Sequence, residues 1–145
     1  MKRILVFVCM VLFLGAFVSA EYAAADRFVN KGYGTVTDTQ TGLMWADHDN
    51  GSDINWHNAK SYCEGYSGGG KSGWRMPTMN ELKWLHNSGA YGSVINITGS
   101  FVWSSETRGS VADVFYYFSA GGVPLFNNPL SLDYDRRALP VRSGQ

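Results

Sequence analysis

The sequence has few cysteines, few histidines and little clustered charge, and these shortages exclude several classes of protein. Only two cysteines occur in 145 residues, so the chain is not a small domain held together by several disulfides. The three histidines, His48, His57 and His86, show neither the spacing nor the cysteine pairs of a zinc site. No basic run exceeds two residues, as at Arg136-Arg137. We therefore expect no zinc site and no nucleic-acid partner.

The N-terminal segment has the pattern of an export signal. Lys2 and Arg3 precede an apolar run from Ile4 to Val18, and small residues follow it at Ser19 and Ala20. This run is shorter than the roughly 20 apolar residues that span a bilayer, so we expect cleavage after residue 20 and no retained membrane span. The expected location is the periplasm, the cell surface or the medium. The predicted organisation is a signal peptide at 1–20, a flexible leader at 21–27 and a single domain at 28–145.

The mature chain is long enough for one domain with its own core and too short for two. Loss of Lys2 and Arg3 leaves ten of the 12 basic residues against 12 acidic ones, a net charge of about −2. Cys63 is then the one remaining cysteine, so no intramolecular disulfide can form. Because Cys63 lies on the apolar stripe of a predicted helix, we expect it to be a buried, unreactive thiol.

Two segments have helical features. Asn55 can cap a first helix, and apolar residues recur after it at helical spacing, namely at Trp56, Ala59, Tyr62, Cys63 and Tyr66. Thr78 begins a second helix, and Glu81, three residues later, completes a reciprocal capping box. We expect the second helix to end near Asn87 and to bury one face that contains Met79, Leu82 and Leu85.

The other ordered segments are predicted strands. An N-terminal hairpin is predicted from 34–37 and 43–45. Further strands are predicted at 101–103, 114–118, 123–126 and 137–141, with a hairpin turn at Gly121-Gly122 and Pro140 at a strand end or edge. A hairpin, two helices and then strands make an α+β fold.

Six signatures follow one family pattern in order along the chain, at 34–38, 41–45, 56–63, 74–82, 103–105 and 140–142. By these residues the chain resembles the Lcl C-terminal domain family of bacterial proteins. The resemblance implies a fold similar to C-type-lectin and sulfatase-modifying-factor domains, with two helices packed on a small, twisted, mostly antiparallel sheet and long loops. It also implies the role of the C-terminal head of a collagen-like adhesin that binds sulfated glycosaminoglycans. This chain departs from that pattern, because it has no Gly-X-Y stalk and its slight negative charge disfavours a sulfated polyanion.

Most residues of these signatures are interpreted as scaffold, because a capped helix, buried indoles and a guanidinium that binds a carboxylate all hold structural joints. The scaffold residues are Trp45, Trp56, Trp74, Arg75, Pro77, Thr78, Glu81, Trp103 and Arg142. Recognition is assigned to three predicted loops at 90–100, 106–113 and 124–134. Their aromatic residues Tyr91, Phe126 and Tyr134 are the candidate ligand-binding residues, and each could equally belong to the core.

One acidic loop has part of the pattern of a calcium site. Asp47, Asp49 and Asp53 place carboxylates at alternate positions in a glycine-containing loop, which is how short loops surround calcium. The glutamate that closes an EF-hand loop is absent, because Asn58 stands at that position. A solvated turn before the first helix explains the same residues equally well. We expect no cofactor, with calcium as the open alternative.

The sequence contains no nucleophile motif and no metal-binding constellation, so an enzyme is the third and least favoured reading. The first prediction is a secreted, non-catalytic binding or adhesion module that recognises a glycan or protein through surface loops. The alternative is a structural, envelope-associated protein–protein interaction domain. The expected partner is accordingly a glycan or a protein of the envelope or host surface.

Overall fold

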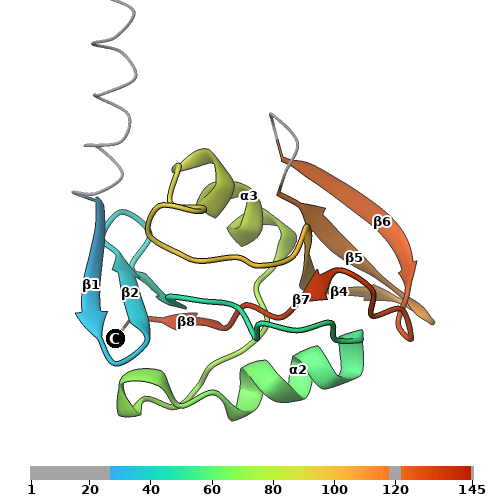
Figure 1. Ribbon diagram of the computed structural model, residues 1–145, viewed down its shortest axis with the longest axis horizontal. Helices are drawn as coiled ribbons and strands as arrows, with labels where there is room; N and C mark the ends of the chain where they lie inside the picture. The colour runs from blue at the N-terminus through green and yellow to red at the C-terminus, as the bar shows by residue number, and fades with distance from the viewer. Residues whose placement is uncertain (1–26, 118–121, 145) are drawn as a thin grey trace, which may run out of the picture.

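The computed structural model describes residues 27–117 and 122–144, and the predicted signal peptide and residues 21–26 of the leader lie outside them. The described part contains two α-helices and two four-stranded sheets. The predicted α+β class is confirmed, whereas the prediction of one sheet is wrong (Figure 1). Within the described residues, none of the helices has the length and apolar character needed to cross a membrane.

The first sheet confirms the predicted N-terminal hairpin. Its strands are antiparallel and occur in the order β1 (Phe28–Gly32), β2 (Thr35–Asp38), β3 (Leu43–Ala46) and β8 (Val141–Ser143). β1 was not predicted, because only Phe28 of this strand is buried and its remaining residues are exposed. Arg27, the last residue of the predicted leader, donates two hydrogen bonds to Asp38 at 2.6 and 2.5 Å.

The second sheet contains longer strands than the sequence pattern predicted. Its order is β6 (Val123–Pro129), β5 (Val111–Tyr116), β4 (Phe101–Arg108) and β7 (Arg136–Arg137), and only the β4–β7 pairing is parallel. The predicted loops at 106–113 and 124–134 are therefore partly wrong, because strand residues occupy much of both. Backbone pairing continues past a bulge after Trp103 to polar, exposed residues, which side-chain patterns do not reveal. Gly121 of the predicted turn lies outside the described residues.

The C-terminal segment does not form the single closing strand predicted at 137–141. It pairs first with β4 as β7 and then with β3 as β8, so it connects the two sheets (Figure 1). Between them, Ala138 donates its N–H to the Asn50 side chain at 2.8 Å and accepts the Asn50 N–H at 3.1 Å, and Pro140 has no N–H to offer a ladder. Val141 then exchanges backbone hydrogen bonds with Arg75 at 2.9 and 3.0 Å.

Both predicted helices and their caps are confirmed. α2 (Trp56–Gly65) begins after Asn55, whose side chain accepts the Asn58 N–H at 3.0 Å. α3 (Met79–Asn87) begins after Thr78 with the complete capping box, and it buries Met79, Leu82 and Leu85 as expected. These starts follow from contacts within three residues, which is why the sequence alone predicts them.

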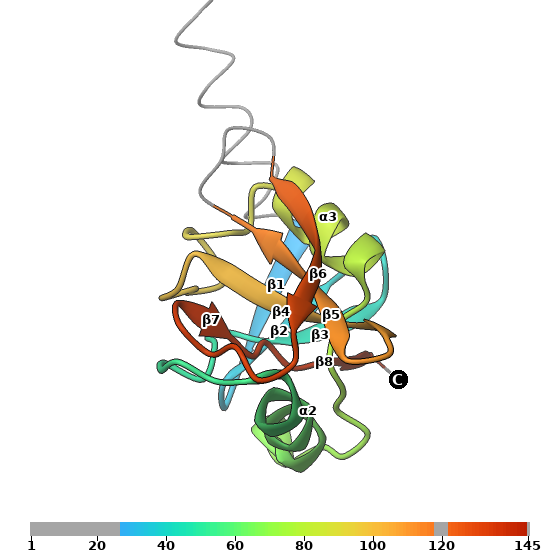
Figure 2. The same cartoon turned by 90° about the vertical axis from the view of Figure 1, so that its right-hand side faces the viewer.

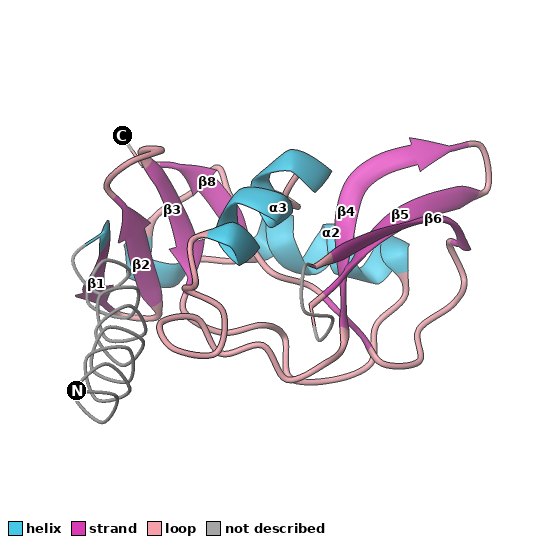
Figure 3. Ribbon diagram, turned by 90° about the horizontal axis from the view of Figure 1, so that it is seen from above, coloured by secondary structure: helices cyan, strands magenta, loops and turns pink. Residues whose placement is uncertain are grey.

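The two helices cover opposite faces of the β4–β5 pair. Val102 and its partner Phe115 face the core cluster that contains Leu82 of α3. The next pair, Trp103 and Val114, faces a second cluster that contains the α2 residues Ala59 and Cys63. Figure 2 shows the helices on either side of these strands, and Figure 3 shows the two sheets toward opposite ends of the described structure. Burial on both faces explains why β4 and β5 contain consecutive apolar residues rather than an alternating pattern.

Candidate functional site

The junction before α3 uses its polar groups inside the fold. Trp74 is 3% exposed and its indole N–H donates to the Lys71 carbonyl at 3.1 Å. The Arg75 guanidinium donates two hydrogen bonds to the Glu81 carboxylate, at 2.8 and 2.6 Å. Glu81 also accepts the Thr78 N–H at 2.8 Å. These contacts hold a structural joint together.

Most of the other signature residues also have contacts within the fold. The Trp56 indole N–H of α2 donates to the Ser104 carbonyl of β4 at 3.0 Å. The Trp103 indole N–H of β4 donates to the carbonyl of Ile54, in the loop before α2, at 2.8 Å. The two bonds connect β4 to α2 and to the loop before it. Trp45 lies in the first core cluster and Pro77 is buried. Arg142 is half-buried on β8.

The carboxylates of the acidic loop bind three different partners. Asp47 pairs with the neighbouring histidine. Asp49 is 2% exposed and accepts the Thr98 N–H at 2.6 Å, whereas Asp53 accepts from the Arg137 guanidinium at 2.6 Å. Throughout residues 27–117 and 122–144, no three or more His, Cys, Asp or Glu side chains form a group that could hold a metal ion. Calcium binding by this loop stays a prediction.

The three predicted ligand-binding aromatics have different neighbours. Tyr91 is partly buried, with its ring centroid 5.0 Å from that of Tyr117. Phe126 lies on β6, is 55% exposed and has the Arg108 guanidinium 5.5 Å above its ring. Tyr134 is 74% exposed in the segment before β7. Phe126 and Tyr134 are thus available to a partner, while Tyr91 packs against the first core cluster.

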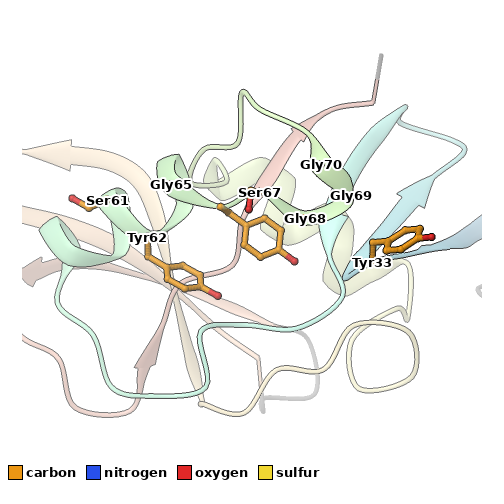
Figure 4. Close-up of a pocket in the computed structure, with 9 residues that line it drawn as sticks. Tyr33, Ser61, Tyr62, Gly65, Ser67, Gly68, Gly69 and Gly70 are labelled. Atoms are coloured by element: carbon orange, nitrogen blue, oxygen red, sulfur yellow. The ribbon is translucent and has the colours of Figure 1, made fainter.

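A surface hollow of about 910 Å³ forms where the β1–β2 turn meets the end of α2 and the short 3-10 turn η1 (Gly68–Gly70) (Figure 4). Three tyrosines, two serines and four glycines line it, and no charged side chain is among them. We call this hollow the tyrosine cleft, and it is lined by Tyr33, Ser61, Tyr62, Gly65, Tyr66, Ser67 and Gly68–Gly70.

Local structure places two of these rings on one side of the cleft. Tyr62 lies in the last turn of α2 and Tyr66 is the capping residue that follows the helix, with their ring centroids 6.3 Å apart. Tyr66 is held by its hydroxyl, which donates to the Gly34 carbonyl at 2.8 Å, and by an edge contact with Trp74 at 4.8 Å between ring centroids. Gly68 lies so close that a Cβ there would be 2.4 Å from the Tyr66 ring.

Tyr33 enters the cleft from the β1–β2 turn in a strained conformation. Tyr33 and Gly34 are the two turn residues, and both have positive φ, 56° and 80°, as in the type I′ turns that favour Asn and Gly. The left-handed conformation costs a residue with a side chain about 1–2 kcal/mol. The ring is 90% exposed, so burial does not offset this cost. Sequence reasoning missed Tyr33, although Gly-Tyr-Gly before a predicted strand signals such a turn.

A second hollow of about 430 Å³ adjoins the tyrosine cleft. The two hollows share Tyr33 and Gly69, and the second extends over residues of β2 and β3 that include Thr37. The hydroxyl of Thr37 is buried and has no hydrogen-bond partner among the described residues. Lys31 and Lys71 also line this second hollow.

The groups of the tyrosine cleft are neutral hydrogen-bonding and apolar groups. Burial raises the pKa of Tyr62 and of Tyr66, and nearby anionic groups raise both further, so both phenols stay protonated near neutral pH. Cys63 follows Tyr62 but points into the second core cluster, where burial raises the pKa of its thiol to about 12. The prediction that Cys63 is a free, buried thiol is confirmed.

The chain shares its signatures with one known family. A comparison with curated proteins found no significant match. The sequence profile of the Lcl C-terminal domain matches residues 34–142, which include both helices and, apart from Tyr33, the whole tyrosine cleft. The chain therefore belongs to the Lcl C-terminal domain family.

Proposed function

We propose that this protein is a secreted, non-catalytic adhesion module that holds a neutral carbohydrate in the tyrosine cleft. The observation that carries the proposal is the convergence of three tyrosines on an uncharged hollow of about 910 Å³. That volume is within the range of small-molecule sites, about 300–1,000 Å³. The absence of charge in the lining favours a neutral ligand over a sulfated polyanion.

The chemistry of the cleft suits a sugar. Tyrosine combines a flat apolar ring with a polar hydroxyl, and a pyranose likewise combines a C–H face with a rim of hydroxyls. In the described structure, the Tyr66 hydroxyl donates to Gly34 and the Ser61 hydroxyl donates to His57. The hydroxyls of Tyr33, Tyr62 and Ser67 have no such partner among the described residues, so they can donate to a ligand.

Family membership supports the adhesive part of the proposal, and the export pattern of residues 1–20 supports delivery out of the cytosol. Two helices on two small, mostly antiparallel sheets are compatible with a C-type-lectin-like fold, which we include in the proposal. No contact that we assign to the sugar requires calcium. Calcium at Asp47, Asp49 and Asp53 would be a separate property of the protein.

A glycan array followed by titration calorimetry on the mature protein tests this function. We expect reproducible binding of neutral glycans by the wild type. Tyr62→Ala should weaken the affinity about three- to tenfold, which corresponds to the free energy of one aromatic contact. Tyr134→Ala is the matched control, because Tyr134 is equally a tyrosine but lies outside the cleft lining. Its binding should equal that of the wild type, with or without EDTA.

Three results would contradict the proposal. The first is an array without any neutral glycan bound. The second is a loss of binding in Tyr134→Ala but not in Tyr62→Ala, which would move recognition to the loops. The third is binding only of sulfated chains with an affinity that falls steeply with salt, because an uncharged cleft cannot produce that dependence.

The edge strand β6 favours a second candidate function, a protein–protein interaction domain of the envelope. β6 is at the edge of its sheet and exposes Val123, Leu125 and Phe126, at 41%, 37% and 55%. Pro124 and Pro129 each remove a backbone donor from this edge, which weakens pairing with another strand. Loss of a co-purifying envelope protein on Phe126→Ser, with glycan binding unchanged, would support this candidate.

A further inference from the structure

We infer that the site takes a linear glycan of at least two sugar units, with Tyr33 between two subsites as the residue that determines chain-length specificity. The inference rests on the proposed function, because it assumes that the tyrosine cleft binds carbohydrate. It adds the class of glycan and the role of a residue outside the matched family range of 34–142.

The first step is that the two hollows form one continuous surface. The tyrosine cleft and the second hollow share Tyr33 and Gly69 in their linings. Gly69 donates its N–H to the Tyr33 carbonyl at 3.0 Å, so the η1 turn and the β1–β2 turn are fixed to each other. Figure 4 shows the glycine turn between Tyr62 and Tyr33. With no side chains on this turn, a ligand chain can pass close to the backbone.

The second step is that fold stability does not explain a tyrosine at position 33. The residue has a φ of 56° in a two-residue turn and its side chain is 90% exposed. Asn or Gly would fit this turn with less strain, and an exposed ring gains little from burial. Tyr33 is thus a strained, exposed aromatic residue that lines two adjoining hollows. Such a residue is expected where its ring contacts a ligand.

The third step is the different chemistry of the second hollow. The tyrosine cleft presents aromatic rings and neutral hydroxyls, whereas the second hollow presents donors from Lys31 and Lys71. A second sugar unit would provide hydroxyls for these groups. A single sugar in the tyrosine cleft would leave them unused.

Calorimetric titration with oligosaccharides of one to four units tests the inference. The probes are three linear series, β1,4-linked N-acetylglucosamine, β1,4-linked glucose and α1,4-linked glucose. For the series that binds, we expect the affinity of the wild type to rise about tenfold or more from one unit to two or more. In Tyr33→Asn this rise should be lost, while the melting temperature should increase by about 2–8 °C as turn strain is removed. Trp84→Gln, at an exposed aromatic residue of α3 outside the linings of both hollows, should keep the rise.

The outcomes separate this inference from the proposed function. Binding that is equal for one and four units, or a rise that survives in Tyr33→Asn, would overturn the two-subsite inference and leave the proposed function standing. Failure of all three series to bind, together with a silent glycan array, would overturn both. A simultaneous gain in melting temperature and loss of length dependence cannot come from misfolding, so that result would support a recognition role for Tyr33.

Discussion

At the scale of single residues, Glu81 receives hydrogen bonds from both sides of the junction before α3. Glu81 is 7% exposed, and its carboxylate accepts from the Arg75 guanidinium and from the Thr78 N–H. Burial by itself would raise the pKa of Glu81. The hydrogen bonds from Arg75 and Thr78 outweigh this effect, so the pKa lies below its ordinary value of 4.5.

This lowered pKa predicts acid sensitivity. The unfolded chain binds the Glu81 proton at a higher pH than the folded chain does, because the pKa is lower in the folded state. The stabilisation by Glu81 is therefore complete above the unfolded-state pKa, about 4.5. It is lost as the pH falls through the lower folded-state pKa. We expect Glu81→Gln to lower the free energy of unfolding by about 1–3 kcal/mol at pH 7 and to reduce its dependence on pH below about 5. Urea denaturation from pH 7 to 3 measures both.

Glu64→Gln is the matched control. Glu64 pairs with Lys60 one helical turn away, and both side chains are about half exposed, so the change should be within about 0.5 kcal/mol of the wild type. Some acid sensitivity will remain in Glu81→Gln, because Asp38 also has a lowered pKa. Equal pH profiles for Glu81→Gln and the wild type would show that the Glu81 contacts do not contribute as described.

At the scale of elements, the end of α2 and the η1 turn together form the tyrosine cleft. Gly65 ends the helix and a Cβ there would meet nothing within 4 Å. Gly68, three residues later, has the Tyr66 ring directly against its Cα, so a Cβ would be 2.4 Å from it. Of these two glycines, Gly68 therefore has a steric reason to lack a side chain, whereas Gly65 has room for one.

This difference yields a paired prediction. Gly68→Ala should displace the Tyr66 ring, lower the free energy of unfolding by about 1–3 kcal/mol and weaken glycan binding. Gly65→Ala should leave stability unchanged or raise it by up to about 1 kcal/mol, because alanine favours the helix. Thermal denaturation and calorimetry of both variants provide the measurements. If Gly68→Ala changes neither the melting temperature nor glycan binding, Tyr66 is not held as tightly as its contacts indicate.

At the scale of the whole molecule, residues 136–143 join the two sheets. β7 pairs with β4, β8 pairs with β3, and Val141 also exchanges hydrogen bonds with Arg75. Leu139 and Val141 are fully buried in the first core cluster, while Ala138 belongs to the second. One short segment thus contributes to both sheets and both clusters, so we expect the domain to unfold as one cooperative unit.

Truncation tests this expectation. A chain that ends at Arg137 should lose the near-ultraviolet circular dichroism of both Trp45 and Trp103, which lie in different clusters, because neither sheet is stable without the joining segment. A chain that ends at Ser143 keeps β8 and loses one described hydrogen bond, from Gly144 to Gly42, so it should fold with a loss of about 1 kcal/mol. Persistence of the Trp103 signal in the shorter chain would show that the second sheet folds independently.

The predictable parts of this fold depend on contacts that are short in sequence. The caps at Asn55 and Thr78 and the buried face of α3 involve residues three or four positions apart, so the sequence predicted them correctly. The hairpin of β2 and β3 follows from one local turn. The prediction of a single closing strand was wrong because the partners of residues 136–143 lie far away in sequence, at β3, β4 and Asn50.

The candidate site likewise has parts that follow from local sequence and parts that depend on contacts between distant segments. The sequence by itself determined the family, the α+β class, both helices and the identity of the residues that hold the joint before α3. Only the tertiary structure decided that Tyr33 and Tyr66, 33 positions apart, line one cleft, where the Tyr66 hydroxyl donates to the carbonyl of Gly34 beside Tyr33. Packing of distant segments creates a cleft, and no local pattern of residue types encodes which segments will meet. The sequence left open whether the loop aromatics are exposed or buried, and the structure exposes Phe126 and Tyr134 but packs Tyr91 against the core. The tyrosine cleft likewise required the fold.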